Sequence, residues 1–224
     1  MLEKVSQAST SISQERRAKL LLFSIVLYFV LPPLIENNEI GSLCLLLNLY
    51  VTLVATTMQL AEKRIIFRSA IPIAAVSMVS QAVSHFYPTR PLVIGNGIAL
   101  TAFLGFASIS LYGYLGEAGR VTTGRIYISA SLYFLLGLSW YSVFNLLNIA
   151  EPGSFAEGGT PLPGNVPMST MLYFSLVTLT TLGYGDIVPV TPAAKMITTL
   201  EAVTGVLYVA ITVARLVGSR EAGS

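Results

Sequence analysis

Long apolar segments, separated by short polar ones, make up most of the chain. A segment of about 20 apolar residues can cross a bilayer as a helix. The candidate segments lie at residues 20–35, 41–61, 65–87, 91–115, 124–149 and 192–217. Only 11% of the 224 residues are charged, whereas soluble domains have about 25%. The pattern predicts an all-α membrane protein with six spanning helices, the first being the shortest.

The basic residues divide unevenly between the segments that join these helices. With the N-terminus inside, eleven of the thirteen Lys and Arg residues lie in inner segments, and only Arg90 and Lys195 lie outside. Basic residues concentrate on the cytoplasmic side of membrane proteins. We therefore expect both termini in the cytoplasm and the chain in a plasma (inner) membrane, and the short loops favour a prokaryotic one. The net charge of +2 gives no reason to expect a nucleic-acid partner.

A half-length apolar segment, residues 168–180, leads into the sequence Thr-Thr-Leu-Gly-Tyr-Gly-Asp at 180–186. A site that strips water from a cation must offer oxygens in place of the hydration shell, and backbone carbonyls do this when several point toward one axis. Glycine tolerates the alternating dihedrals that such a strand requires. The alternative is a glycine-rich turn beside a strand. The preceding helix and the flanking spans favour the cation site.

This sequence resembles the selectivity filter of potassium channels, whose pattern is Thr-x-Gly-Tyr-Gly. The wider resemblance is to the pore module of six-helix potassium channels, especially the voltage-gated family, and is sharpest over 176–190 and 205–210. It implies a filter formed by Thr181, Leu182, Gly183, Tyr184 and Gly185, with K⁺ bound at the first four. Leu182 replaces the usual valine or isoleucine, so filter rigidity is the property most open to change.

One filter per chain implies a ring of four identical chains, because the filter must close around an axis. Three identical subunits and the lipid bilayer are the expected partners, and K⁺ is the permeant ion, with no organic cofactor. The expected organisation is a cytoplasmic N-terminal tail (1–18), a four-helix transmembrane domain (19–116), a linker (117–124), a pore domain (125–218) and a C-terminal tail (219–224). The short tail fits either a whole channel or part of a longer one.

The four helices ahead of the pore module indicate a voltage-sensor-like domain that lacks gating charges. The segment 91–115 contains no Arg or Lys, and Arg90 stands alone at its outer end. Each charge that crosses 100 mV contributes only about 2.3 kcal/mol, so steep voltage gating needs several. We therefore expect a passive K⁺ conductance that is not steeply voltage-gated.

Residues around the filter are expected to support it. Thr180 and Asp186 flank the filter. The Tyr173 hydroxyl is expected to bond Asp186, 13 residues away, and so brace the filter; interfacial packing of the ring is an equal alternative. Glu201 is expected behind the filter, bonded to a pore-helix hydroxyl, Thr178 or Ser175, and the alternative is a carboxylate that faces the cavity and attracts cations.

Gly205 stands where related channels often have a bending glycine, so it is either a gating hinge or a site of close helix packing. Two other functions compete with a potassium channel. A non-selective cation channel usually lacks the tyrosine or the second glycine of the filter, and a non-conducting scaffold would retain the pattern without using it. No paired carboxylates, Ser/His/Asp set or metal-ligand cluster indicates an enzyme.

Overall fold

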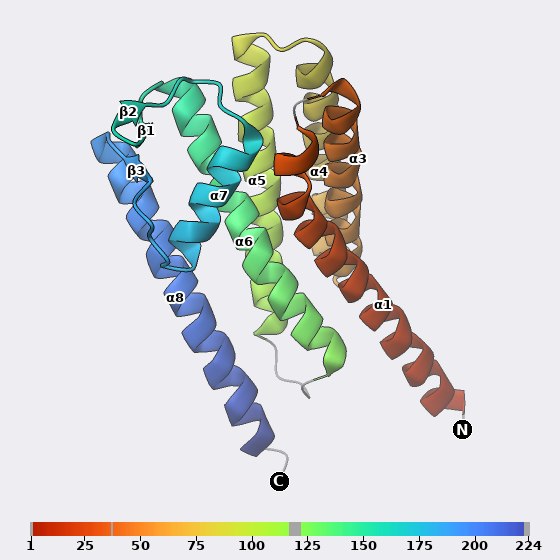
Figure 1. The fold of residues 1–224 in the computed structure, drawn as a ribbon. Coiled ribbons are helices and arrows are strands. Elements are labelled where there is room, and N and C mark those ends of the chain that lie inside the picture. Colours follow the sequence, from red (N-terminus) through yellow and green to blue (C-terminus); the bar gives the residue numbers. More distant parts are fainter. Residues whose placement is uncertain (1, 37, 117–121, 222–224) are drawn as a thin grey trace.

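The structure is a computed structural model and describes residues 2–36, 38–116 and 122–221. Its helices are α1 (Leu2–Val30), α2 (Pro32–Ile35), α3 (Glu39–Gln59), α4 (Arg64–Phe86), α5 (Arg90–Leu115), α6 (Thr123–Ala150), α7 (Met168–Leu179) and α8 (Pro192–Glu221), with a 3₁₀ turn at Leu60–Glu62 (Figure 1). Residues 117–121, most of the expected linker, lie outside the described part, as does Arg120.

The first helix differs most from the prediction. It begins at Leu2, inside the expected tail, and ends at Val30, whereas a span over 20–35 was predicted. Pro32 and Pro33 lack the backbone N–H needed to continue the helix, so α2 forms a separate short turn. Among the described helices, five are long and apolar enough to cross a membrane. They are α3, α4, α5, α6 and α8.

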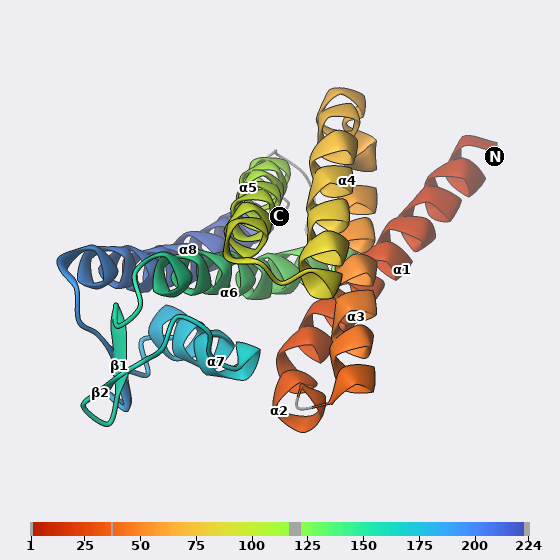
Figure 2. The same cartoon turned by 90° about the horizontal axis from the view of Figure 1, so that it is seen from above.

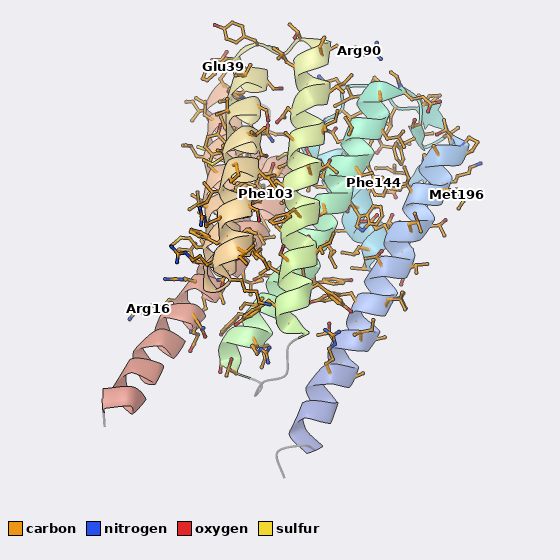
Figure 3. The ribbon with its side chains drawn as sticks, turned by 180° about the vertical axis from the view of Figure 1, so that it is seen from behind. Arg16, Glu39, Arg90, Phe103, Phe144 and Met196 are labelled. Carbon is orange, nitrogen blue, oxygen red and sulfur yellow. The ribbon has the colours of Figure 1, made fainter. Side chains whose placement is uncertain are left out.

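One face of the half of α1 next to α2 is nevertheless buried within the bundle. Leu21, Ile25 and Tyr28 recur at helical spacing and are almost completely covered. Both α1 and α5 lie against α6 of the same chain, and Figure 2 shows the bundle beside the pore module. The four-helix domain and the pore module therefore share one core, which includes Phe103 on α5 and Phe144 on α6 (Figure 3).

The two ends of the molecule differ in what they carry. Glu39 and Arg90 lie at one end and Arg16 at the other (Figure 3). Both described chain ends are at the Arg16 end, whereas the short strands lie at the opposite end (Figure 1). This arrangement agrees with the expected placement of the connecting segments on two sides of a membrane.

The pore module consists of α6, the half-length α7 and α8, with α7 packed against both longer helices. The chain enters along α7 and returns to the same end of the molecule (Figure 1). The polar segment between α6 and α7 contains a hairpin of β1 (Phe155–Glu157) and β2 (Thr160–Pro161). Strand β1 also pairs antiparallel with β3 (Ile187–Pro189), which follows the filter. The hairpin is thereby joined to the far end of the filter.

Helix bounds otherwise follow the apolar pattern closely. Helix α7 ends at Leu179, one residue before the predicted end, and α8 continues to Glu221, past the predicted domain boundary at 218. The prediction of an all-α membrane protein is confirmed for the membrane part, because the described sheet has only three short strands, all at one end.

Candidate functional site

Helix α7 is held at both ends by side chains from other elements. At its start, Ser169 donates its backbone N–H to Glu36 Oε2 (3.1 Å), and its hydroxyl donates to Glu36 Oε1. A carboxylate here satisfies free N–H groups and faces the positive end of the helix dipole. At its other end, the Leu179 carbonyl accepts a hydrogen bond from the Tyr133 hydroxyl (3.3 Å). The negative end of α7 therefore has a fixed position next to the filter.

The sign of the φ angle alternates from one filter residue to the next. Thr181, Gly183 and Gly185 have φ angles of 59°, 58° and 78°. Leu182 and Tyr184, between them, do not have positive φ, and Thr181 is the only described non-glycine residue that does. Alternation of this kind turns each peptide unit over relative to a regular strand, so that successive carbonyls can point to one side, as a cation site requires. Glycine accepts positive φ without strain, whereas threonine does so at a cost typical of functional sites.

The N–H groups of the first filter residues turn back toward α7. Thr181 donates to the Thr178 carbonyl (2.9 Å) and Leu182 donates to the Val177 carbonyl (2.9 Å). Thr180 caps the helix, and its hydroxyl donates to the Leu176 carbonyl (2.7 Å). The N–H groups of Thr181 and Leu182 therefore bond to carbonyls of α7. Among the described hydrogen bonds, none is accepted by the backbone carbonyls of residues 181–184, so these oxygens can bind a cation.

The filter is uncovered in a single chain. All residues from 180 to 186 are exposed, including the apolar side chains of Leu182 (55% exposed) and Tyr184 (67% exposed). Their own chain covers less than half of each of these two side chains. A second surface is needed to cover them.

Asp186, at the outer end of the filter, is held from three directions. Its carboxylate accepts hydrogen bonds from the Tyr173 hydroxyl (2.6 Å) and the Ile187 N–H (3.0 Å). Its carbonyl accepts one from the N–H of Gly158 in the hairpin (3.0 Å). The bond from Tyr173 holds the pKa of the Asp186 carboxyl below its ordinary value of 3.8. The structure therefore brings together the two residues expected to form the brace.

Glu201 lies behind α7 and is fully buried. The Ser175 hydroxyl is 2.6 Å from Glu201 Oε1 and 2.7 Å from the Gly137 carbonyl oxygen, so it connects α6, α7 and α8. Glu201 Oε2 has no hydrogen-bond partner in the described part of the chain. Of the two hydroxyls that the sequence offered as partners, Ser175 rather than Thr178 makes the contact.

Gly205 on α8 lies directly against the end of α7. A Cβ at this position would overlap the Leu179 carbonyl oxygen, the same oxygen that Tyr133 bonds. The close packing that competed with the hinge is therefore present, and the hinge stays a prediction.

Sequence reasoning missed Glu36, Ser169 and Tyr133, and it did not expect the hairpin to contact Asp186. Glu36 is 133 residues from Ser169, so no local spacing links them. The described part of the chain contains no group of three or more His, Cys, Asp and Glu side chains that could hold a metal ion.

Comparison with known sequences relates part of this chain to ion channels. Residues 127–219 match the ion channel family. The chain is 36% identical over 85 residues to two pore potassium channel c of Oryza sativa subsp. japonica (38% of this chain, 16% of that protein). It is 34% identical over 103 residues to potassium voltage-gated channel protein shk-1 of Caenorhabditis elegans (46% and 19%). It is 28% identical over 134 residues to voltage-gated potassium channel Kch of Escherichia coli (strain K12) (60% and 28%).

The chain thus spans less than a third of the length of each of these relatives. No solved structure matches it. The matched residues include most of α6, all of α7 and most of α8, and this part of the chain is similar in sequence to ion channel domains, with voltage-gated potassium channels among the relatives. With five described helices long and apolar enough to cross a bilayer, the chain is a multi-pass membrane protein, and its residues 127–219 match an ion channel family.

Proposed function

We propose that four copies of this chain form a potassium-selective channel that conducts K⁺ passively. The alternating backbone at Thr181, Gly183 and Gly185 is the observation that carries this proposal. It aligns the oxygens of residues 181–184 along one side, where they replace the hydration shell of K⁺. The negative end of α7 adds a favourable potential for a cation below the filter.

The tetramer is supported by surface that a single chain leaves uncovered. Leu182 and Tyr184 are exposed apolar side chains on the filter. Helix α8 is also largely exposed along its length, with large apolar side chains at Met196, Leu200 and Val206. Adjacent copies around a fourfold axis would cover the filter side chains and part of α8, while the carbonyls face the axis.

The same geometry supports roles for the residues around the filter. Tyr173 and Asp186 brace its outer end, and Thr180 ends the pore helix. Glu201 acts structurally behind the filter, because it is fully buried and contacts Ser175. The termini are cytoplasmic, and the membrane is a plasma membrane of a prokaryote.

Gating is not steeply voltage-dependent. In the described structure, Arg90 is the only Lys or Arg of α5, and it lies at the outer end of that helix. Its guanidinium donates to the Ala150 carbonyl at the end of α6 (3.3 Å). A single peripheral charge cannot supply the free energy that several charges supply in a voltage sensor.

Flux from liposomes that contain the purified chain tests the proposal, with K⁺ or Na⁺ as the permeant ion and Ba²⁺ as the blocker. We expect Ba²⁺-sensitive flux that strongly prefers K⁺. Equal flux of both ions would replace the proposal with a non-selective channel, and Leu182 would be the first residue to change to valine. Absence of flux from tetramers, with protonophore and valinomycin controls intact, would indicate a non-conducting scaffold.

A further inference from the structure

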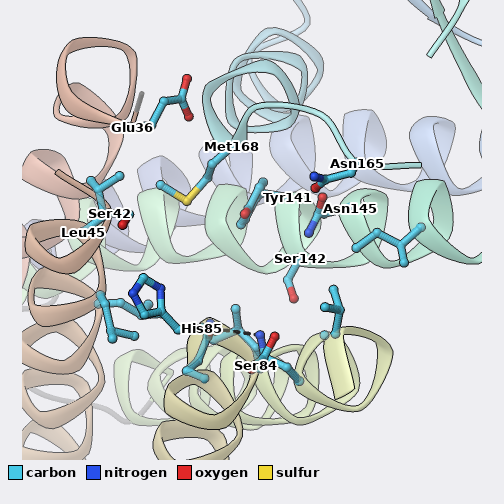
Figure 4. Close-up of a pocket in the computed structure, with 18 of the residues that line it drawn as sticks. Glu36, Ser42, Leu45, Ser84, His85, Tyr141, Ser142, Asn145, Asn165 and Met168 are labelled. Carbon is cyan, nitrogen blue, oxygen red and sulfur yellow. Dashed lines mark hydrogen bonds between the residues drawn. The ribbon is translucent and has the colours of Figure 1, made fainter. Parts of the chain in front are cut away.

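A polar pocket of about 440 Å³ lies between the four-helix domain and the pore module. Its walls come from the α2–α3 region, α4, α5, α6 and the segment just before α7 (Figure 4). Glu36 and Asn165 contribute to the side next to α7, and His85 and Ser84 come from α4. The volume is in the range of small-molecule sites. The pocket is separate from the filter and shares no residue with it.

Several polar groups on these walls have no partner in the protein. Within the described part of the chain, no hydrogen bond is made by the side chains of Tyr141, Asn145, Asn165 or Ser84. Tyr141 is only 7% exposed and Ser84 only 8%. Buried polar groups are nearly always hydrogen-bonded, to protein, water or a ligand. None of these polar atoms is among the fully buried atoms that lack a partner, so they open into the pocket and are available to a bound molecule that offers donors and acceptors.

The charge of the lining selects the class of that molecule. Glu36 is the only carboxylate that lines the pocket, and no Lys or Arg is among the described lining residues. Each Glu36 oxygen accepts one hydrogen bond from Ser169, and a carboxylate oxygen can accept a second. An ammonium group matches this remaining capacity, and hydroxyl groups match the amides and the Tyr141 phenol.

We propose that this pocket binds small hydroxylated ammonium compounds and that Glu36 couples their binding to the position of α7 in the pore module. Glu36 is shared between the pocket and the first turn of α7, so a bound ammonium competes with or reorients its bonds to Ser169. Helix α7 carries the filter at its other end. Occupancy therefore changes K⁺ flux, a consequence that rests on the proposed channel function; binding itself does not.

Binding is tested on the 224-residue chain in detergent or nanodiscs with N-methylglucamine, an impermeant hydroxylated ammonium, and with sorbitol as its neutral counterpart. Calorimetry measures affinity, and fluorescence of the single tryptophan, Trp140, which precedes Tyr141, gives a second signal. We expect saturable binding of N-methylglucamine and at least about tenfold weaker binding of sorbitol, because a charge-assisted hydrogen bond is lost.

The variants Glu36→Gln and Tyr141→Phe locate the site. We expect Glu36→Gln to weaken N-methylglucamine binding about tenfold or more and Tyr141→Phe to weaken it about threefold to tenfold. Glu39→Gln is the matched control, because Glu39 is an exposed carboxylate nearby that does not line the pocket. Size-exclusion profiles establish that each variant is folded.

Three results would overturn the proposal: no saturable binding, equal affinity for sorbitol, or unchanged affinity in folded Glu36→Gln. Potassium flux measured without amine tests the channel function separately. If the amine binds in a Glu36-dependent manner but no K⁺ flux is seen, the pocket stands and the channel function fails. If K⁺ flux is normal and the amine does not bind, the channel function stands and the pocket proposal fails.

Discussion

The pore module and the four-helix domain are held together in different ways. Around α7, long-range hydrogen bonds fix particular atoms: Glu36 to Ser169, Tyr133 to Leu179 and Tyr173 to Asp186. In the four-helix domain, the core is mainly apolar, and the polar contacts between helices are few, such as those of Asn96 with Ser80 and Gln81.

The difference shows that a segment can be held firmly in position and still leave its side chains exposed. The pore loop is precisely tied at its ends, yet its functional face is open in a single chain, since Leu182 and Tyr184 are exposed. The four-helix domain instead packs Phe103 and Leu104 into the core that it shares with α6, but among its described residues it has no row of charges that would make it a sensor. The part that contains the filter sequence is therefore the part whose exposed side chains the proposed tetramer would cover. Five predictions test this contrast.

The largest effect is expected from Gly183→Ala in the filter. Its control is Gly158→Ala in the hairpin, because the two glycines have similar φ (58° and 55°) and neither Cβ would meet an atom within 4 Å. Each substitution should strain the backbone by about 1–2 kcal/mol per subunit. We expect Gly183→Ala to abolish K⁺ preference in liposome flux and Gly158→Ala to retain it. Equal loss in both would mean that the outer hairpin matters as much as the filter.

Gly205→Ala tests the contact between α8 and the end of α7. The added methyl group overlaps the Leu179 carbonyl, so we expect a loss of about 1–3 kcal/mol per subunit. Gly105→Ala on α5 is the control, because its Cβ would meet nothing within 4 Å. Thermal dissociation of the tetramer measures both. Unchanged stability of Gly205→Ala together with impaired activation would favour the hinge over packing.

Glu201 separates a structural role from a role in the ion cavity. Glu201→Gln preserves size and hydrogen bonding to Ser175, so we expect near-normal single-channel conductance from intact tetramers. Glu201→Ala leaves a cavity behind α7 and should cost about 2–3 kcal/mol per subunit. A strong loss of conductance in Glu201→Gln tetramers would contradict the structural role and favour a carboxylate that attracts cations.

The apolar pattern predicted most of the fold because membrane helices follow directly from length and hydropathy. The bounds of α3 to α8 agree with it to within a few residues, whereas α1 does not, since its polar first half carries no such signal. The hairpin was also missed. Its strands are only two and three residues long, and β1 pairs with a segment beyond the filter.

At the site, what could be predicted depended on how far apart the partners lie. The filter is local in sequence, and Tyr173 and Asp186 are separated by one half-helix and the filter, so their contact could be anticipated. Glu36 and Ser169 are 133 residues apart, and Tyr133 reaches Leu179 only because α6 and α7 cross. Such contacts depend on tertiary packing, which no spacing rule encodes.

The brace between Tyr173 and Asp186 should affect the lifetime of the open filter more than its selectivity. Tyr173→Phe removes the hydrogen bond to Asp186. We expect the rate of slow inactivation to increase and single-channel openings to shorten, while the preference for K⁺ is retained. The pKa of Asp186 is lowered in the folded protein, so its contribution is present above the ordinary value of 3.8 and is lost as external pH falls through the lower folded value. Unchanged inactivation in Tyr173→Phe would leave the ring a packing residue.

Arg90→Gln should have the smallest effect and bears on the four-helix side of the contrast. Arg90 lies at the outer end of α5 and donates to Ala150 on the neighbouring helix. A charge in this position crosses little of the membrane field, and even a full crossing of 100 mV supplies only about 2.3 kcal/mol. We expect the conductance–voltage relation in planar bilayers to be shallow and to keep its slope in the variant. The contradicting result would be a wild-type gating charge of several elementary charges that is reduced in Arg90→Gln. It would mean that α5 moves as a voltage sensor despite its composition. The four-helix domain and the pore module would then be coupled by voltage-driven movement and not only by packing.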